Sequence, residues 1–305
     1  MPKILITGAT GFIGSWLVSH LLSKNNNLIA HGSSKETISI LKENLKKKDI
    51  SLKNIEFWEQ NFMEKEWDFP STISDVEAII HTAAASRVRK GFIDNYDEYF
   101  KLNVICPKIL AKKALEINIK HFIHLSTGQV FGIPENFPFT EQTPKNPINL
   151  YGYTKLMGEY VVASLGVLGL HYTIARPFSV FGRGHYNIIS IITDKILNND
   201  TLTIYGDGSQ SRAFLYVIDF CRAIDLILFN EKCYSEDFNI SGSNEYSVNY
   251  LVQLISNALK KKPKIEHKEP IVNELKRNIA DLSKIRKLGF EPTKSLEEFI
   301  KNDLL

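Results

Sequence analysis

Residues that can move a proton stand close together near the middle of this chain. Tyr151 and Lys155 are four residues apart, and the pair Ser126 and Thr127 precedes them. A spacing of four places both side chains on one face of a helix, so the ammonium could stabilise the phenolate. Tyr151 is therefore the candidate proton donor, Lys155 its cation, and Thr127 the hydroxyl that orients a substrate oxygen. Tyr153 competes for the donor role, but at two residues from Lys155 it is expected to point away.

A glycine-rich segment at the N-terminus indicates what this pair would act beside. Gly8, Gly11 and Gly14 follow a short apolar run and open an amphipathic stretch, which is the context of a dinucleotide phosphate loop. Gly8 would end the strand in a tight turn, Gly11 would let the backbone approach a pyrophosphate, and Gly14 would allow close helix packing. To act beside a nicotinamide at neutral pH, Tyr151 would need its pKa lowered from ~10 to ~7. That shift requires about 4 kcal/mol of stabilisation of the phenolate. Together the two motifs predict redox chemistry on a carbonyl.

The residues near the end of the second predicted strand bear on the choice of dinucleotide. An acidic side chain there binds the 2′-hydroxyl of NAD, whereas the 2′-phosphate of NADP calls for cations and hydroxyls. The chain has Ser33, Ser34 and Lys35, and Glu36 comes late and beside a lysine. This segment favours NADP(H). The alternative is NAD(H), held by its diphosphate and adenine alone.

Short apolar runs alternate with helical patterns through the first half of the chain. Strands are predicted at residues 3–7, 28–31, 55–59, 78–82, 121–126 and 171–175, and helices at 12–23, 35–47, 96–118 and 151–168. This alternation is typical of an α/β fold with a Rossmann-type, doubly wound parallel sheet. We expect residues 1–176 to form the dinucleotide-binding domain, with 214–242 returning to it. Residues 177–213 and 243–305 would form a smaller α/β substrate-binding region.

The composition is that of an ordinary globular protein. Of the 305 residues, 44% are hydrophobic and 23% are charged, with a net charge of +3. So small a charge gives no support for a nucleic-acid or membrane-surface partner. Cys106, Cys221 and Cys233 are too scattered for a disulfide framework or a metal site, which predicts no metal and a reduced, cytoplasmic setting. The apolar N-terminal run is too short for a signal peptide, and nothing approaches the ~18 residues of a membrane span.

Taken in order, these motifs resemble an extended short-chain dehydrogenase/reductase of the NAD-dependent epimerase/dehydratase family, whose members act on nucleotide sugars. The resemblance covers nearly the whole chain. Besides the glycine loop, Asn103 and the segments around Thr127 and Tyr151, it rests on residues 81–84, 176–182, 206–212, 280–284 and 288–292. It implies a nucleotide-sugar oxidoreductase with a nicotinamide dinucleotide cofactor.

The resemblance also implies roles for individual residues. Cofactor contacts are expected from the glycine loop, residues 33–35, Tyr151 and Lys155, together with Thr10, Phe12, Ile13, Asn61, Phe62, Thr82, Ala83, Ala84, Asn103, Pro177 and Phe178. Asn187 and Arg212 match positions that bind the substrate diphosphate, and a guanidinium can fork onto two phosphate oxygens. Substrate contacts are further expected from Ser86, Arg87, Thr127 and Gln129. The alternatives are a solvated loop around Arg87 and a surface pair between Arg212 and Asp207.

The two positions after Thr127 depart from the family pattern and narrow the reaction. Members that dehydrate the sugar across C5 and C6 have an Asp-Glu pair there, and decarboxylating members keep the glutamate. This chain has Gly128 and Gln129, which cannot act as carboxylic acid or base, so both reactions are disfavoured. NADPH-dependent reduction of a 4-keto sugar and NAD-dependent 4-epimerisation remain. The residues at 33–35 favour the reductase over the epimerase.

Two further hypotheses concern a non-enzymatic role and assembly. A dinucleotide-sensing regulator is the distant alternative, because such relatives lose the Tyr/Lys pair that this chain keeps. In the family, helices matching residues 96–118 and 151–168 pair across a dimer axis, so the resemblance implies a homodimer. The same apolar faces could instead pack on the sheet.

Overall fold

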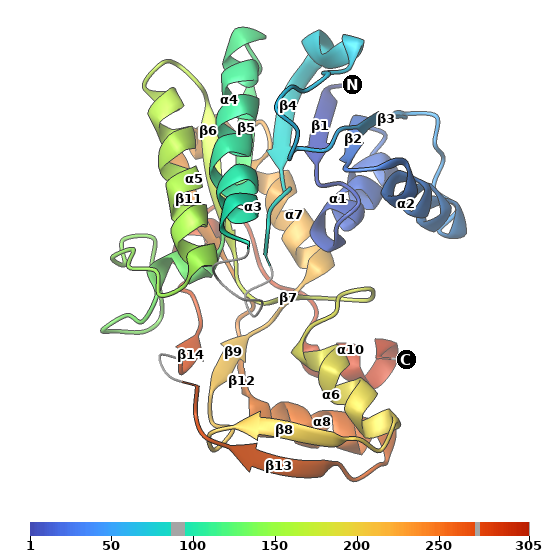
Figure 1. Cartoon of the computed structure of the whole chain (residues 1–305), viewed down its shortest axis with the longest axis vertical. Coiled ribbons are helices and arrows are strands. Elements are labelled where there is room, and N and C mark those ends of the chain that lie inside the picture. The colour runs from blue at the N-terminus through green and yellow to red at the C-terminus, as the bar shows by residue number, and fades with distance from the viewer. Residues whose placement is uncertain (87–94, 272–274, 305) are drawn as a thin grey trace.

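The computed structural model describes residues 1–86, 95–271 and 275–304. Its larger part is a sheet of seven parallel strands in the order β11-β6-β5-β4-β1-β2-β3 (Figure 1). The strands are β1 (Lys3–Thr7), β2 (Asn27–Gly32), β3 (Ile55–Glu59), β4 (Val76–His81), β5 (His121–Leu125), β6 (Tyr172–Pro177) and β11 (Glu236–Ile240). The strand order reverses between β1 and β4, which places the ligand crevice at their carboxyl ends. The predicted Rossmann-type sheet is confirmed.

Alternate residues of the central strands face two helical layers. Ile4 and Ile6 of β1 belong to the core under α1 (Phe12–Ser23), α2 (Lys35–Lys47) and α7 (Val217–Ile227), whereas Leu5 belongs to the core under the opposite layer. That layer contains α4 (Cys106–Glu116) and α5 (Leu150–Gly166), which pack side by side (Figure 1). Because both faces are covered, the central strands are buried at almost every position, and the short apolar run within each of them predicts it.

The helix predicted over residues 96–118 is interrupted. It consists of α3 (Tyr96–Phe100), a π-helical turn (Lys101–Ile105) and α4. Pro107 has no N–H to donate to the carbonyl of Asn103, so the regular i to i−4 pattern cannot continue across this point. A side chain on Gly158 of α5 would lie 2.3 Å from that same carbonyl oxygen. The interruption therefore lies against α5, where that helix carries no side chain.

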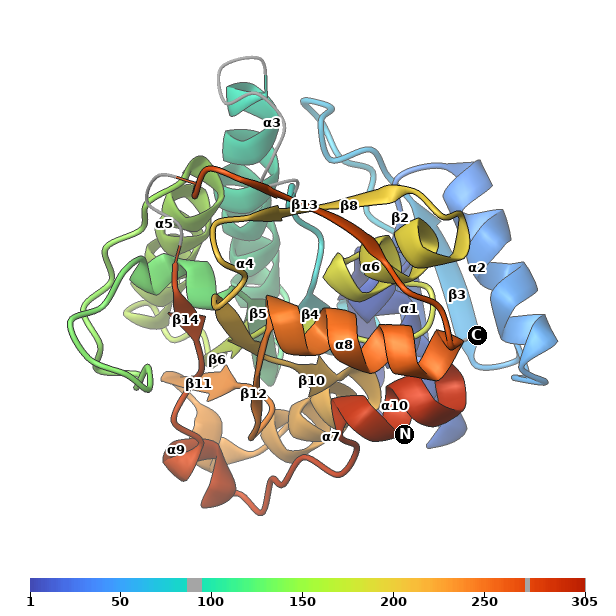
Figure 2. The same cartoon turned by 90° about the horizontal axis from the view of Figure 1, so that it is seen from below.

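The smaller part contains short sheets and three helices, seen from below in Figure 2. Its helices are α6 (Ile188–Leu197), α8 (Val248–Leu259) and α10 (Leu296–Asp303). Its strands pair as β8 (Thr201–Tyr205) with β13 (Lys264–Lys268), as β7 (Val180–Phe181) with β10 (Leu215–Tyr216), and as β12 (Glu245–Ser247) with β9 (Ser211–Ala213) and β14 (Arg277–Asn278). The three helices share a core of their own with β7, β8, β10 and β12.

Several segments from the C-terminal half of the chain pack on the larger part rather than the smaller one. α7 and β11 join the large sheet and its core, and both lie within residues 214–242. Ile285 of α9 (Ser283–Arg286) and Phe290 also pack into that core, a second return that sequence analysis did not include. Across the described ranges, no helix is both long and apolar enough to cross a membrane. The exact domain boundaries stay a prediction.

Candidate active site

Two glycines shape the loop after β1. Gly8 has φ +66°, and a Cβ there would lie 2.7 Å from the Ala83 backbone. A Cβ on Gly14 would lie 2.1 Å from the Gly8 carbonyl oxygen, so α1 can begin directly against the loop only without it. The loop and the first turn of α1 line a cavity. Backbone amides and a helix N-terminus in that position suit a diphosphate.

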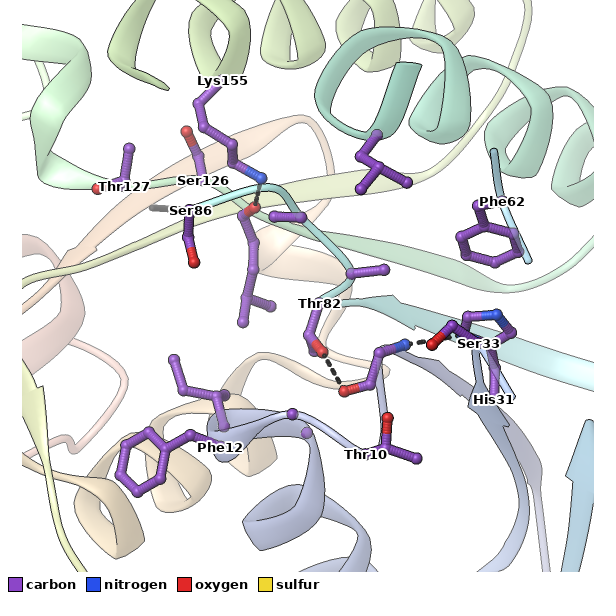
Figure 3. Close-up of a pocket in the computed structure, with 18 of the residues that line it drawn as sticks. Thr10, Phe12, His31, Ser33, Phe62, Thr82, Ser86, Ser126, Thr127 and Lys155 are labelled. Carbon is purple, nitrogen blue, oxygen red and sulfur yellow. Dashed lines mark hydrogen bonds between the residues drawn. The ribbon is translucent and has the colours of Figure 1, made fainter. Parts of the chain in front are cut away.

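This cavity, which we call the dinucleotide cavity, lies over the carboxyl ends of β1, β2, β4 and β5 and has a volume of about 620 Å³ (Figure 3). Small-molecule sites typically measure ~300–1,000 Å³. Among its lining residues are the predicted cofactor residues Gly8, Thr10, Gly11, Phe12, Ile13, Gly14, Ser33, Asn61, Phe62, Thr82, Ala83, Ala84, Tyr151, Lys155 and Pro177. Ser86 and Thr127, predicted to bind substrate, line it too. The glycine loop and the Tyr/Lys pair thus meet around one space.

The first turns of α5 present the predicted catalytic residues to this cavity. Tyr151 forms a hydrogen bond with the Thr127 hydroxyl. Lys155 is buried one turn later, and its Nζ donates to the carbonyl oxygen of Leu125 at the end of β5 (Figure 3). Tyr153, the competing donor, is 47% exposed and is not among the lining residues. Only one of the two tyrosines therefore has both a hydroxyl partner and access to the cavity.

Burial is the largest cause of the pKa shifts of Tyr151 and Lys155. Burial raises the pKa of Tyr151 to about 12, although the bond to Thr127 acts to lower it. Burial also lowers the pKa of Lys155 to about 8, against the attraction of the Glu159 carboxylate. In the chain alone, desolvation of the phenolate outweighs the bond to Thr127, and the shift of the Tyr151 pKa toward ~7 expected beside a nicotinamide stays a prediction. A positively charged ligand group beside Tyr151 would act in the opposite direction.

The loop after Thr127 fixes the start of α5. Asn149 accepts the Gly152 N–H at 2.8 Å and donates from Nδ2 to the side-chain oxygen of Gln129 at 3.2 Å. The Gln129 N–H in turn donates to the Thr127 hydroxyl at 3.3 Å. Gln129 thereby connects Thr127 to α5, and it is not among the cavity-lining residues. Its predicted contact with substrate stays a prediction.

Four predicted cofactor residues are not among those that line the dinucleotide cavity. The Ser34 hydroxyl caps α2 by accepting the Thr37 N–H at 3.3 Å, and Lys35 begins that helix. Phe178 is buried in a separate aromatic cluster with Phe131 and Phe139. There it packs against Gly128, where a Cβ would lie 2.7 Å from the Phe178 ring.

The fourth, Asn103, is fully buried in the π-helical turn. Its Oδ1 accepts the Ala85 N–H, and its Nδ2 donates to the Ala85 carbonyl and to the Thr154 hydroxyl, each at 3.0 Å. Asn103 therefore supports the segment after β4 rather than facing the cavity. Arg87, predicted to bind substrate, lies outside the described residues.

His31 lines the dinucleotide cavity and was not predicted. It is the residue before the last of β2, and the Gly8 N–H donates to its Nδ1 at 3.0 Å. Its Nε2 donates to the Gln60 carbonyl at 2.8 Å, and burial lowers its pKa to about 4. The available signal was a polar residue at the end of an otherwise apolar strand.

A buried charge pair beneath Lys155 was also not predicted. Glu159 accepts hydrogen bonds from Nε and a terminal nitrogen of Arg176, both at 2.8 Å, and from the Ser126 hydroxyl at 2.5 Å. Arg176 also contacts Asp237 at 2.7 Å. Ser126 lines the cavity beside Thr127, so the pair connects α5 and β6 to the end of β5. An acidic residue one turn after Lys155 was the signal in the sequence.

Further residues that line the dinucleotide cavity were not predicted. They are Met63, Glu98, Leu102, Leu125, Val180 and His185.

A second cavity of about 450 Å³ adjoins the first, since Val180 and His185 line both. It contains both residues predicted to bind the substrate diphosphate, Asn187 and Arg212. Asn187 caps α6 through its Oδ1, which accepts the Ile189 N–H at 2.8 Å. The rest of the lining is largely apolar, with Ile188, Ile191, Ile192, Leu202, Ile204, Phe214, Tyr246, Val248 and Leu251 among the residues. We call this space the apolar cavity.

A Rossmann-type sheet, a glycine loop and a Tyr/Lys pair around one cavity define the class of nicotinamide-dinucleotide-dependent enzymes. A family model sharpens this assignment, because residues 4–241 match the NAD dependent epimerase/dehydratase family. The chain belongs to that family.

The matches to named relatives cover nearly the whole chain. A putative UDP-glucose 4-epimerase from Methanocaldococcus jannaschii is 32% identical over 308 residues, which cover 98% of this chain and 96% of the relative. A UDP-glucuronic acid 4-epimerase from Bacillus cereus, solved with a fluorinated UDP-glucuronic acid and NAD, has a TM-score of 0.90 at 25% identity and covers 99% of this chain and 98% of its own. A UDP-glucose 4-epimerase from Thermotoga maritima, solved with UDP-glucose, has a TM-score of 0.84 at 27% identity, with 99% and 97% covered.

Proposed function

We propose that this chain is an NAD-dependent 4-epimerase of a nucleoside-diphosphate sugar. The observation that carries the proposal is the meeting of Thr127, Tyr151 and Lys155 at the dinucleotide cavity, with no carboxylate at positions 128 and 129. The structure gives less support to an NADPH-dependent reductase than residues 33–35 did in the sequence. Of residues 33–35, only Ser33 lines the cavity, while Ser34 caps a helix. The relatives named above, which are described as 4-epimerases, support the same choice.

The cavity residues suggest how the reaction would proceed. The dinucleotide, when bound, supplies the acceptor and donor of hydride at C4 of the sugar. Tyr151 as phenolate takes the proton of the 4-hydroxyl, and the Thr127 hydroxyl holds the same oxygen in place. Lys155 keeps a positive charge beside them. When the C4–H bond re-forms on the other face, Tyr151 returns its proton to the oxygen, so no net proton or electron is gained.

The apolar cavity supplies a place for the rest of the substrate. It adjoins the dinucleotide cavity along Val180 and His185, so a sugar beside Tyr151 could carry its nucleotide into it. Arg212 would bind the diphosphate through its guanidinium, and the apolar side chains would contact the base. Ser86 would contact the sugar from the segment after β4.

Two measurements test the proposal. Denaturing the purified protein should release NAD in near-stoichiometric amount, because an epimerase must keep its cofactor through the ketone stage. The folded protein should then interconvert UDP-glucose and UDP-galactose, or UDP-glucuronic and UDP-galacturonic acid, with no dinucleotide added. Turnover only of a 4-keto sugar, with one NADPH consumed per product, would establish the reductase instead.

A further inference from the structure

The segment between β7 and α6 lies where the two cavities meet. His185, in this segment, lines both the dinucleotide cavity and the apolar cavity. The substrate of the proposed function has its reacting carbon beside Tyr151 in the first cavity and its nucleoside in the second. Its diphosphate joins the sugar to the nucleoside and would therefore cross the boundary at which His185 lies.

A tight turn places His185 at this boundary. Its N–H donates to the Gly182 carbonyl oxygen at 3.3 Å. Gly184, the third residue of the turn, has φ +86°, a conformation that residues with a Cβ rarely adopt. Two residues after His185, Asn187 caps α6. The turn and the start of α6 therefore fix the backbone of His185 from both sides.

The imidazole of His185 is held by one face and by one nitrogen. It lies flat on Phe12, in the first turn of α1, with the ring centres 4.1 Å apart and the planes 10° from parallel. Phe12 itself lines the dinucleotide cavity (Figure 3). Nδ1 of His185 lies 3.0 Å from the Val180 carbonyl oxygen and 3.2 Å from Nδ2 of Asn187. With a proton Nδ1 donates to the carbonyl, and without one it accepts from the amide.

The other ring nitrogen, Nε2, stays available for a ligand. Within the described part of the chain it has no hydrogen-bond partner. Nε2 carries a proton in the imidazolium and in the neutral tautomer whose Nδ1 accepts from Asn187. Burial lowers the pKa of His185, and the bond to the Val180 carbonyl acts in the opposite direction. A phosphate beside the ring would favour the two states in which Nε2 can donate.

Two diphosphates could approach this nitrogen, and the surroundings favour that of the sugar nucleotide. The diphosphate of the dinucleotide is provided for by the amides of the glycine loop and the N-terminus of α1. Phe12 covers one face of the ring where it meets that helix. In the apolar cavity His185 is accompanied by Arg212, whose guanidinium is suited to phosphate.

We propose that His185 binds the diphosphate of the substrate by donating a hydrogen bond from Nε2. The proposal rests on the proposed function for the class of substrate, a nucleoside-diphosphate sugar, and not on epimerisation. The stack on Phe12 and the contacts of Nδ1 orient the ring before the substrate binds, so little order has to be gained on binding. A hydrogen bond to a charged group of this kind changes affinity by about ten- to a hundredfold.

The test compares UDP with uridine, which lacks the diphosphate, on the full-length protein as purified. Titration calorimetry at neutral pH measures UDP directly and uridine by competition with UDP. His185→Phe keeps a flat ring on Phe12 but has no donor, whereas His185→Gln restores an N–H at a similar reach. We expect His185→Phe to bind UDP at least about tenfold more weakly, with uridine within about threefold, and His185→Gln to bind UDP within about threefold of the unaltered protein.

The other outcomes overturn the assignment. Equal losses of UDP and uridine would make His185 a packing residue for Phe12. Loss of the bound dinucleotide from His185→Phe, with the ratio of UDP to uridine affinity unchanged, would assign Nε2 to the dinucleotide diphosphate. A selective loss of UDP that His185→Gln does not restore would rule out donation from Nε2. An unaltered protein that binds UDP no more tightly than uridine, or binds neither, would also contradict the proposal.

The role of His185 and the proposed reaction fail separately. Epimerisation without a selective loss of UDP binding would refute only the role of His185. A selective loss in a protein that does not epimerise any sugar nucleotide would refute only the proposed reaction. Circular dichroism checks folding, and His185→Ala gives the same comparison of UDP with uridine should His185→Phe not fold.

Discussion

Tyr151 and Tyr153 carry the same hydroxyl two residues apart in opposite surroundings, which allows a matched test. Tyr151 lines the dinucleotide cavity and bonds to Thr127, whereas Tyr153 is on the outer face of α5. Loss of a general acid–base group typically costs ~10²–10⁴-fold in rate. We expect Tyr151→Phe to lower kcat by that factor while NAD still copurifies, and Tyr153→Phe to stay within about twofold. Unchanged turnover in Tyr151→Phe would remove Tyr151 from the proton-transfer role.

The Glu159–Arg176 pair gives a prediction for stability at the level of single residues. Both side chains are buried, and removing one partner of a buried pair costs roughly 3–5 kcal/mol, because it leaves an uncompensated charge. Glu159→Gln should lower the free energy of unfolding, measured in urea, by about 3 kcal/mol, since Asp237 still contacts Arg176. The control is Glu116→Gln, which breaks an exposed pair with Lys113 on α4 and should change stability little. Similar losses in both variants would contradict this account.

Among the strands, β2, β4 and β5 place histidines inside the protein. Burial lowers the pKa of His31 to about 4 and that of His121 to about 3, and it holds those of His81 and His124 well below the ordinary value. In the unfolded chain a histidine takes up its proton near pH ~6.5. As the pH falls from 6.5, the unfolded state is therefore protonated first, and stability that is fully present above pH 6.5 is progressively lost.

The expected loss is large enough to measure. Between pH 6.5 and 5 each of His31 and His121 should cost about 2 kcal/mol, from ~1.36 kcal/mol per pH unit. Urea unfolding at pH 7.5, 6.5, 5.75 and 5 gives the slope. His121→Gln should flatten it by about one proton, whereas His267→Gln, in exposed β13, should leave it unchanged. Identical slopes in all three proteins would show that these histidines do not control acid stability.

The elements were predictable to the extent that local pattern determines them. Strands buried on both faces contain short apolar runs. Gly11 and Gly14 are determined locally, because a Cβ on either would approach the Gly8 carbonyl oxygen, whereas Gly8 itself lies against Ala83, which is distant in the chain. The π-helical turn was missed although Pro107 was a visible signal, because the helical pattern of residues 96–118 continues on both sides of that proline. The Glu159–Arg176 pair and the contacts of His31 were missed because their partners, on β6 and at the end of β3, are distant in the chain.

At the scale of the whole molecule, the two cavities depend on how the chain passes between its two parts. Val180 and His185, which line both, belong to the segment that leaves the large sheet after β6. The same large sheet receives α7, β11 and α9 from the C-terminal half. Because the chain crosses repeatedly, the parts are held together by several connections, and the substrate would bind across them.

The outer face of α5 carries apolar side chains that no described part of the chain covers. Tyr153, Met157 and Tyr160 are 47%, 42% and 61% exposed and lie four and three residues apart, so they form one stripe on the helix. α4 packs beside α5 on the same layer (Figure 1). An apolar stripe of this kind is suited to a self-complementary interface, and we predict a homodimer through these two helices.

Light scattering tests this assembly directly. The unaltered protein should have twice its chain mass of 34.7 kDa at micromolar concentration. The double variant Met157→Glu with Tyr160→Glu places two charges in the stripe and should give the mass of one chain. Ile40→Glu is the matched control, because Ile40 is 52% exposed on α2, at the far side of the sheet from α5, and should leave the dimer intact. A single-chain mass for the unaltered protein would contradict the dimer and leave the stripe without a partner.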